Sequence, residues 1–115
     1  MKDTGLREQA FLVLTALAPE PQHGYTIIES VQRISDGRVR LHTGSLYAIL
    51  DRLREMGLIE VDHEEIVASR LRRYYRLTGA GATRLADETA VLRRHADAAA
   101  ARLRRFNALH GGGTA

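Results

Sequence analysis

The fold of this chain is decided by residues 41–59, which read LHTGSLYAILDRLREMGLI from Leu41 to Ile59. Apolar residues recur within this stretch at a spacing that places them on one face of a helix. They are Leu46, Ile49, Leu50 and Leu53. Thr43 is placed to cap the first turn, and Gly57 can adopt the left-handed conformation that ends a helix. The stretch therefore predicts an amphipathic helix with defined ends.

The polar face of this helix has the composition of an element that contacts nucleic acid. Thr43, Gly44 and Ser45 stand at its N-terminus, where unpaired backbone N–H groups and the helix dipole favour a phosphate. Tyr47 adds a hydroxyl group, and Arg52 adds a guanidinium group that suits phosphate or guanine. An ordinary charged surface helix is the alternative that the same residues allow.

Length and composition limit the class of protein. The chain has 115 residues, enough for one domain with a modest core. Its net charge is only +3, so a polyanionic partner must be argued from where the charges lie. The absence of cysteine excludes disulfides and thiolate metal sites. No apolar run approaches the roughly 20 residues of a membrane span, so a cytoplasmic protein without a membrane partner is expected.

Two helices are predicted before the central one. The first runs from about Leu6 to Ala18 and is apolar on too many sides for one packing partner, so Phe11 and Leu14 are assigned to a dimer contact. The second runs from about His23 to Ser35 and ends in an Asp36-Gly37 turn. Its inward residues are Tyr25, Ile28, Val31 and Ile34, or alternatively Ile27 with Val31. Together with the central helix they predict a helix-turn-helix.

After Gly57 the apolar pattern changes to period two, which predicts a β-hairpin. Its first strand begins at Ile59, residues 64–69 form its loop, and residues 70–77 form the return strand. The return strand carries four arginines and two tyrosines, and Arg70, Arg72 and Tyr74 are predicted to point outward. A solvated basic strand is one reading. Beside a helix-turn-helix, the hairpin resembles the wing of a winged helix lying along a phosphate backbone.

A last helix is predicted from about Ala80 to Leu109, capped by Thr78. At 1.5 Å per residue it is roughly 42 Å long, more than a small domain can cover, so its apolar stripe is expected to contact a second subunit. Folding back on its own domain is the alternative. The stripe consists of Leu85, Leu92, Ala99, Leu103 and Phe106. The expected organisation is a winged-helix domain at 1–78, a dimerisation helix at 79–110 and a disordered tail at 111–115.

Several short motifs follow one another in order across residues 6–81. They are His23-Gly24-Tyr25, Gly44-Ser45-Leu46-Tyr47, Arg52-Leu53, Gly57-Leu58-Ile59, the run Arg72-Arg73-Tyr74-Tyr75-Arg76-Leu77-Thr78, and Gly81. In this order and spacing they resemble the PadR-like family of bacterial transcriptional regulators. The family pattern usually has a proline after the tyrosine of the recognition helix, where this chain has Ala48. That difference changes local helix geometry but removes no group that contacts DNA.

The resemblance implies a mainly α fold: a winged helix-turn-helix with a small β-hairpin, followed by one long dimerisation helix of the short C-terminal class. It also implies a sequence-specific, DNA-binding repressor that is released by a small aromatic or amphipathic effector. A homodimer would bind an inverted-repeat operator in double-stranded DNA. Tryptophan, which lines the drug pocket of some relatives, is absent.

Two other classes of function are weighed against this one. A winged-helix module that contacts only proteins fits the modest net charge but leaves the arginine cluster unexplained. Enzymes and metal sensors fit poorly, because the five histidines include no pair on adjacent turns of a helix and no catalytic constellation stands out. No catalytic residue, metal or cofactor is therefore predicted.

Overall fold

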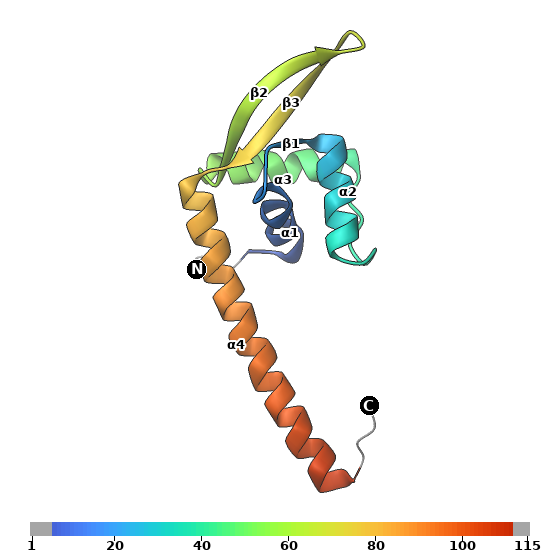
Figure 1. The fold of residues 1–115 in the computed structure, drawn as a ribbon, viewed down its shortest axis with the longest axis vertical. Helices are drawn as coiled ribbons and strands as arrows, with labels where there is room; N and C mark the ends of the chain where they lie inside the picture. The colour runs from blue at the N-terminus through green and yellow to red at the C-terminus, as the bar shows by residue number, and fades with distance from the viewer. Residues whose placement is uncertain (1–5, 112–115) are drawn as a thin grey trace. The chain divides into compact units, whose positions relative to one another are not determined.

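The computed structural model describes residues 6–111, and within that range it has four helices and three strands (Figure 1). In chain order they are α1 (Glu8–Leu17), β1 (Gln22–His23), α2 (Gly24–Ile34), α3 (Thr43–Glu55), β2 (Ile59–Val67), β3 (Arg70–Leu77) and α4 (Gly79–His110). The predicted winged-helix class, mainly α with a small β-hairpin and a long final helix, is confirmed. The chain divides into two compact units after Leu85, so α4 begins in the first and makes up the second. Apart from Gly111, the tail predicted at 111–115 lies outside the described residues.

Helix α1 is packed within the first unit on more than one side. Its buried residues are Leu12, Val13, Leu14, Ala16 and Leu17, and it contacts α2, α3 and β3. Its broad apolar surface is therefore covered by its own protomer. The prediction that Leu14 lies in a dimer interface is wrong, because this side chain is 0% exposed in the core. Phe11 is only partly buried.

Helix α2 contributes Ile27 and Val31 to the core, which is the second of the two predicted arrangements. Tyr25 and Ile34, the ends of the first arrangement, are exposed instead. The predicted turn after α2 is confirmed, since Asp36 and Gly37 both have positive φ.

Helix α3 buries Leu46, Leu50 and Leu53, as its spacing predicts. The predicted cap is wrong: His42 is the cap residue, in an extended conformation, and Thr43 is the first residue of the helix. Ser45 completes the cap. Its hydroxyl accepts from the N–H of His42 at 3.2 Å and donates to the carbonyl of His42 at 3.0 Å.

The end of α3 has the predicted geometry. Gly57 adopts φ +75°. The N–H of Leu58 donates to the carbonyl of Leu53 at 3.0 Å, and the N–H of Gly57 donates to that of Arg54 at 2.9 Å. These two bonds define a Schellman motif, which turns the chain directly from α3 into β2.

Strands β2 and β3 form a longer hairpin than predicted. β3 has the predicted bounds, but β2 continues to Val67, so the loop predicted at 64–69 is wrong. The connection consists only of Ala68 and Ser69, both with positive φ, as in a type I′ turn. Residues 64–66 are all exposed, so no alternation of apolar and polar residues marks them as a strand. We refer to this hairpin, residues 59–77, as the wing.

A third strand, β1, was not predicted. It pairs with β3 through Gln22 opposite Tyr75 and His23 opposite Tyr74, which gives the sheet order β1-β3-β2. Tyr75 is buried in the helical core. This pairing attaches the base of the wing to the segment that begins α2, so the wing and the helices are held in one unit (Figure 1).

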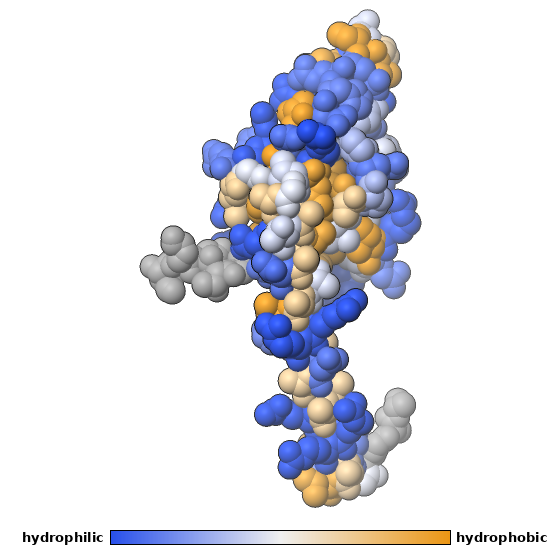
Figure 2. Space-filling model, turned by 60° about the vertical axis from the view of Figure 1, so that its left-hand side comes forward, coloured by the Kyte–Doolittle hydropathy of each residue, from blue (hydrophilic) through white to orange (hydrophobic). Residues whose placement is uncertain are grey.

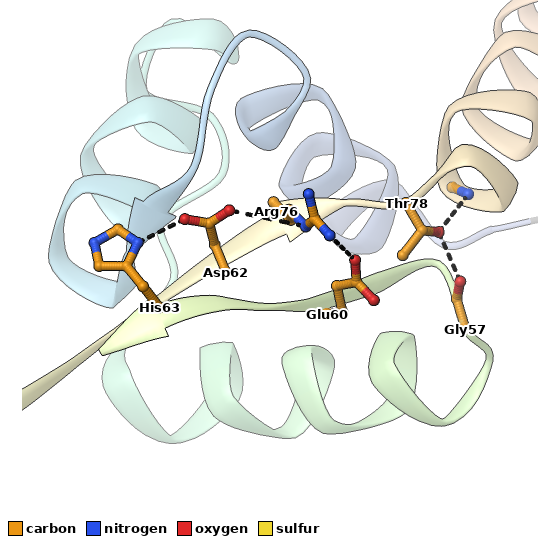
Figure 3. A network of polar contacts seen from close by, with 7 residues as sticks. Gly57, Glu60, Asp62, His63, Arg76 and Thr78 are labelled. Atoms are coloured by element: carbon orange, nitrogen blue, oxygen red, sulfur yellow. Dashed lines mark hydrogen bonds and ion pairs between the residues drawn. The ribbon is translucent and has the colours of Figure 1, made fainter. Parts of the chain in front are cut away.

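The start of α4 is held against the end of α3. The hydroxyl of Thr78 donates to the carbonyl of Gly57 at 2.7 Å and accepts from the N–H of Gly81 at 3.0 Å (Figure 3), which confirms Thr78 as the predicted cap. A Cβ added at Gly81 would lie 2.0 Å from the carbonyl oxygen of Leu58. Gly81 is therefore required by a close approach of helix to backbone.

We expect Gly81→Ala to lower the free energy of unfolding by about 1–3 kcal/mol, because the methyl group meets backbone that cannot move alone. Gly79→Ala is the matched control, since a Cβ at Gly79 meets nothing within 4 Å. In that variant alanine should be neutral or stabilise by under about 1 kcal/mol. Urea denaturation of both variants measures the difference. Equal midpoints would contradict the close contact at Leu58.

The second unit consists of α4 from Ala86 onward. Several of its large apolar side chains are exposed, with Leu92 at 48%, Leu103 at 59% and Phe106 at 55%. They fall on the predicted stripe, with Ala99 between them. None of the helices described between residues 6 and 111 is long and apolar enough to cross a membrane.

Candidate nucleic-acid interface

A cleft of about 350 Å³ lies between the wing and the start of α2 and α3. It brings together three of the predicted site residues: Tyr47 from α3, and Arg70 and Arg72 from β3. The remaining lining residues are His23, Gly24, Tyr25, Val67, Ala68, Leu71 and Arg73. We refer to this hollow as the cleft.

Tyr47 is positioned by a glycine on the neighbouring helix. A Cβ added at Gly24 would lie 2.7 Å from the hydroxyl oxygen of Tyr47 and 3.3 Å from the adjacent ring carbon. The phenol ring therefore rests against the start of α2 and still leaves Tyr47 42% exposed. This contact gives a physical reason for the glycine in the His23-Gly24-Tyr25 motif.

The N-terminus of α3 is open to solvent. Thr43 and Gly44 are exposed, and as the first residues of the helix their N–H groups have no intrahelical acceptor. The Ser45 hydroxyl is engaged in the cap with His42, so it orders the helix start. The group that this end of α3 offers to an anion is therefore backbone N–H, reinforced by the helix dipole.

The arginines of the wing fall into two groups. Arg73 donates to Glu64 at 2.8 Å, and Arg76 pairs with Glu60 and lies 3.8 Å from Asp62 (Figure 3). The hydrogen bond to Glu64 raises the pKa of the Arg73 guanidinium. Within residues 6–111, neither Arg70 nor Arg72 makes an ion pair. Two of the four arginines in the predicted basic patch are thus paired with acidic residues of β2. The two assigned to DNA make no ion pair in this described range, although Arg72 lies opposite Glu65 in the strand register.

Tyr74 is held among aromatic and acidic neighbours. Its hydroxyl donates to Glu65 at 2.6 Å, and its ring stacks on His63 at 4.3 Å and meets the edge of His23 at 5.1 Å. Nδ1 of His63 lies 2.6 Å from Oδ2 of Asp62 (Figure 3). A phosphate contact by Tyr74 therefore competes with Glu65 for the hydroxyl.

Burial, followed by the charge of Arg72, lowers the pKa of the His23 imidazole, although Glu65 and Glu29 partly oppose the shift. The ordinary value is 6.5, so His23 is neutral at pH 7 and adds no charge to the cleft. The positive charge at this edge of the wing is therefore that of Arg72 and Arg70.

Arg52 does not line the cleft. It lines a separate hollow of about 270 Å³ between α1 and α3, together with Arg7, Ala48 and the predicted DNA-binding residue Ser45. Tyr25, by contrast, was interpreted from the sequence as structural but is 68% exposed and lines the cleft. The exposure of Tyr25 could not be predicted because it depends on strand β1, which ends at His23 and was not predicted.

The predicted dimer residues lie in different settings. Phe11 and Leu85 are partly buried and pack against the core of the first unit. Leu92, Ala99, Leu103 and Phe106 are exposed on the second. Among the predicted dimer residues within 6–111, these four leave apolar surface exposed, although the Phe106 ring stacks on His110 at 4.2 Å.

Residues 13–87, more than half of the chain, match the family model described as "Transcriptional regulator PadR-like family". The chain belongs to this family. The match includes α2, α3, the wing and the start of α4, so it contains every residue that lines the cleft. The family is one of transcriptional regulators rather than of enzymes.

Solved structures share this architecture. A PadR family transcriptional regulator from Eggerthella lenta DSM 2243 is 28% identical, with a TM-score of 0.69 over 83% of this chain and 80% of that chain. Bacillus subtilis PadR, solved in complex with operator DNA, has the same fold at 22% identity, with a TM-score of 0.63 over 70% of this chain and 47% of that chain.

A relative is also found by sequence alone. The transcriptional regulator YqjI of Escherichia coli K12 is 31% identical over 61 residues, 53% of this chain and 30% of that protein.

Proposed function

We propose that this PadR-like protein is a dimeric, sequence-specific DNA-binding regulator whose cleft receives the duplex. The observation that carries the proposal is the convergence of two features on one hollow. These are the exposed Tyr47 of α3 and the two wing arginines that make no ion pair within residues 6–111. The open N-terminus of α3 begins one turn of helix before Tyr47. The Bacillus subtilis relative in complex with operator DNA supports the same use of the fold.

Each predicted residue has a role in this proposal. The N–H groups of Thr43 and Gly44 bind a phosphate, while Ser45 orders the helix start. Tyr47 donates its hydroxyl to the backbone or a base edge, and Arg70 and Arg72 neutralise phosphates flanking the groove. Tyr74 mainly holds His63 and Glu65 in place and reaches phosphate only by leaving Glu65. Arg52, outside the cleft, reaches the backbone beyond the central contacts.

Dimerisation through α4 is the second part of the proposal. The stripe of Leu92, Ala99, Leu103 and Phe106 pairs with its copy around a two-fold axis. Phe11 and Leu85, which the sequence also assigns to the dimer contact, are partly buried against the core of the first unit. A two-fold axis brings two copies of α3 to two half-sites, which requires an inverted-repeat operator. Residues 1–78 then form the DNA-binding domain and residues 79–110 the dimerisation helix. We further propose repression, relieved by a small aromatic or amphipathic effector bound between subunits.

The salt dependence of binding tests the roles of the wing arginines. Arg70→Ala and Arg72→Ala should each weaken binding to specific and to random-sequence duplexes by a similar factor, because phosphate contacts carry no sequence information. Each should also reduce the slope of log K against log salt by about one. Arg76→Ala is the matched control, since Arg76 is already paired with Glu60 and Asp62. A lost sequence preference with an unchanged slope would contradict these roles.

Gly24→Ala tests the placement of Tyr47. The added methyl group meets the Tyr47 hydroxyl, the far end of a rotatable side chain, so the ring should swing away at little cost in stability. We expect DNA affinity to fall about 3- to 10-fold, because the loss of one hydrogen bond costs roughly 0.5–1.5 kcal/mol of binding free energy. Tyr47→Phe should produce a similar loss, and combining the two should add little. Full additivity of the two losses would show that Gly24 acts independently of Tyr47.

A protein-interaction module is the second candidate, and one observation favours it. Strand β2 carries Glu60, Asp62, Glu64 and Glu65, so the wing as a whole is nearly charge-balanced. A module of this kind would bind duplex DNA weakly and without strong salt dependence. The two candidates are separated by retention on random-sequence duplex between 50 and 200 mM salt, across which a protein with several phosphate contacts loses orders of magnitude in affinity.

A further inference from the structure

Three glutamates of β2 stand directly opposite arginines of β3, and one of these pairs forms no salt bridge within the described residues 6–111. The pairs are Glu60 with Arg76, Glu64 with Arg73, and Glu65 with Arg72. The first two pairs are salt-bridged. On the face shown in Figure 2, the wing below its tip is mainly hydrophilic, in keeping with these charged pairs. Side chains directly opposite each other in an antiparallel pair have Cβ atoms about 4.5–5.5 Å apart, so distance along the strands does not explain the third pair.

The carboxylate of Glu65 is bound by Tyr74 instead. The Tyr74 hydroxyl donates to Oε2 of Glu65 at 2.6 Å, across a diagonal of the sheet, since Tyr74 itself lies opposite His63. The ring that carries this hydroxyl is fixed, because it stacks on His63 at 4.3 Å and meets the edge of His23 at 5.1 Å. A hydrogen bond to a charged acceptor is generally stronger than an ion pair between exposed side chains. Glu65 is therefore bound by Tyr74 in preference to Arg72.

Glu65 nevertheless remains close to Arg72. Burial first, and then the charge of Arg72, lower the pKa of the His23 imidazole, whereas Glu65 and Glu29 raise it. Both Glu65 and Arg72 are thus within electrostatic reach of one ring. Arg72 lines the cleft and is one of the two wing arginines proposed to bind phosphate. A Glu65 side chain that was free to turn would therefore compete with phosphate for the Arg72 guanidinium, because carboxylate and phosphate oxygens bind it in the same way.

We propose that Tyr74 is a positioning residue for DNA binding, because its hydroxyl retains Glu65 and so leaves Arg72 available to a phosphate. This inference rests on the proposed DNA binding and gives Tyr74 an indirect role in place of a phosphate contact of its own. Glu65 is then an internal competitor of the DNA backbone that the native hydrogen bond keeps away from the guanidinium. Loss of the Tyr74 hydroxyl should affect DNA binding only while the carboxylate of Glu65 is present.

A double-mutant cycle tests this dependence, with binding of the full chain to a random-sequence duplex measured between about 50 and 200 mM salt. Tyr74→Phe keeps the ring between the two imidazoles and removes only the hydroxyl. It should weaken binding about 3- to 10-fold and reduce the salt slope by about one, because Arg72 is then paired within the protein. Glu65→Gln should restore both the affinity and the slope in the Tyr74→Phe background. In the otherwise wild-type chain it should raise affinity by about twofold at most, with the slope unchanged.

Glu29→Gln is the matched control, since Glu29 also acts on His23 but lies on α2. It removes the same charge and should not restore binding to Tyr74→Phe. Rescue by Glu65→Gln alone excludes a folding defect, because the substitution does not replace the missing hydroxyl. If Tyr74→Phe loses the same factor in both backgrounds, or loses nothing, the inference is overturned and DNA binding stands.

A crystal structure of Tyr74→Phe without DNA tests the same contact independently of binding. The carboxylate of Glu65 should lie within about 4 Å of the Arg72 guanidinium, the distance of an ion pair. A Glu65 side chain that stays unpaired in this variant overturns the inference. If the wild-type chain binds no duplex, the proposed function fails, and this structure still decides whether Tyr74 keeps Glu65 from Arg72.

Discussion

Leu92→Asp should be monomeric by light scattering, and its affinity for the operator should fall about 10³-fold or more, to the non-specific level. Leu92 is the first residue of the exposed stripe of α4 and is 48% exposed in the single chain. At a two-fold contact the substitution places two unpaired carboxylates beside each other. Because both subunits carry the substitution, its cost in dimer stability occurs twice. Without the dimer, one α3 contacts one half-site and loses the contribution of the second.

Ala90→Asp is the control for this experiment. Residue 90 is exposed and lies two positions from Leu92, which is about 200° around the helix, so it introduces the same charge on the opposite face. This variant should remain dimeric with wild-type affinity. A dimeric Leu92→Asp variant that keeps operator affinity would exclude α4 as the interface and leave the exposed part of α1 as the remaining candidate.

Thr43→Glu should stabilise the protein and at the same time reduce its DNA binding by about 10- to 100-fold. Thr43 is the first residue of α3, where a carboxylate interacts favourably with the helix dipole by roughly 0.3–1 kcal/mol. The same carboxylate occupies the position proposed for a phosphate, so it repels the DNA backbone and competes for the N–H groups. Effects of opposite sign on stability and affinity are not produced by a folding defect.

Thr43→Gln separates charge from size, because glutamine has the shape of glutamate without its charge. It should lose only a few-fold in affinity and gain no stability. Thermal denaturation and a duplex titration of both variants provide the two readouts. If Thr43→Glu binds DNA as tightly as the wild type, the N-terminus of α3 does not bind phosphate.

The helical part of the fold could be predicted from the sequence because its signals are local. The spacing of Leu46, Leu50 and Leu53 and the glycine at 57 are sufficient to define α3 and its end. The cap could not be predicted from residue preference, since Thr43 is a better capping residue than His42 in general. The actual cap depends on Ser45, whose hydroxyl satisfies the N–H of His42.

The wing shows where local pattern is insufficient. Residues 64–66 belong to a strand because they pair with β3. Both faces of the hairpin are exposed there, so the sequence has no alternation of apolar and polar residues that would indicate the strand. Strand β1 is only two residues long and exists because of its partner. Likewise, the broad apolar surface of α1 led to the prediction of a dimer contact there. The assignment of Leu14 to that contact was wrong because the side chain is buried where α1 packs against α2, α3 and β3.

The candidate site was predicted in part. Tyr47, Arg70 and Arg72 were identified by residue type and come together in the cleft. The distinction between free and paired arginines was not accessible, because it depends on the β2–β3 register. A bulge between Val61 and His63 shifts that register, and it brings Glu64 opposite Arg73. Arg52 was chosen as an exposed cation on α3, but it faces the hollow beside α1.

Selection of bound duplexes from a random-sequence library tests most directly whether this chain is a dimeric reader of DNA. We expect enrichment of an inverted repeat whose half-sites are centred about 10–10.5 bp apart, or at a multiple of that spacing. Enrichment of a single asymmetric half-site, or of no sequence at all, would contradict dimeric, sequence-specific binding.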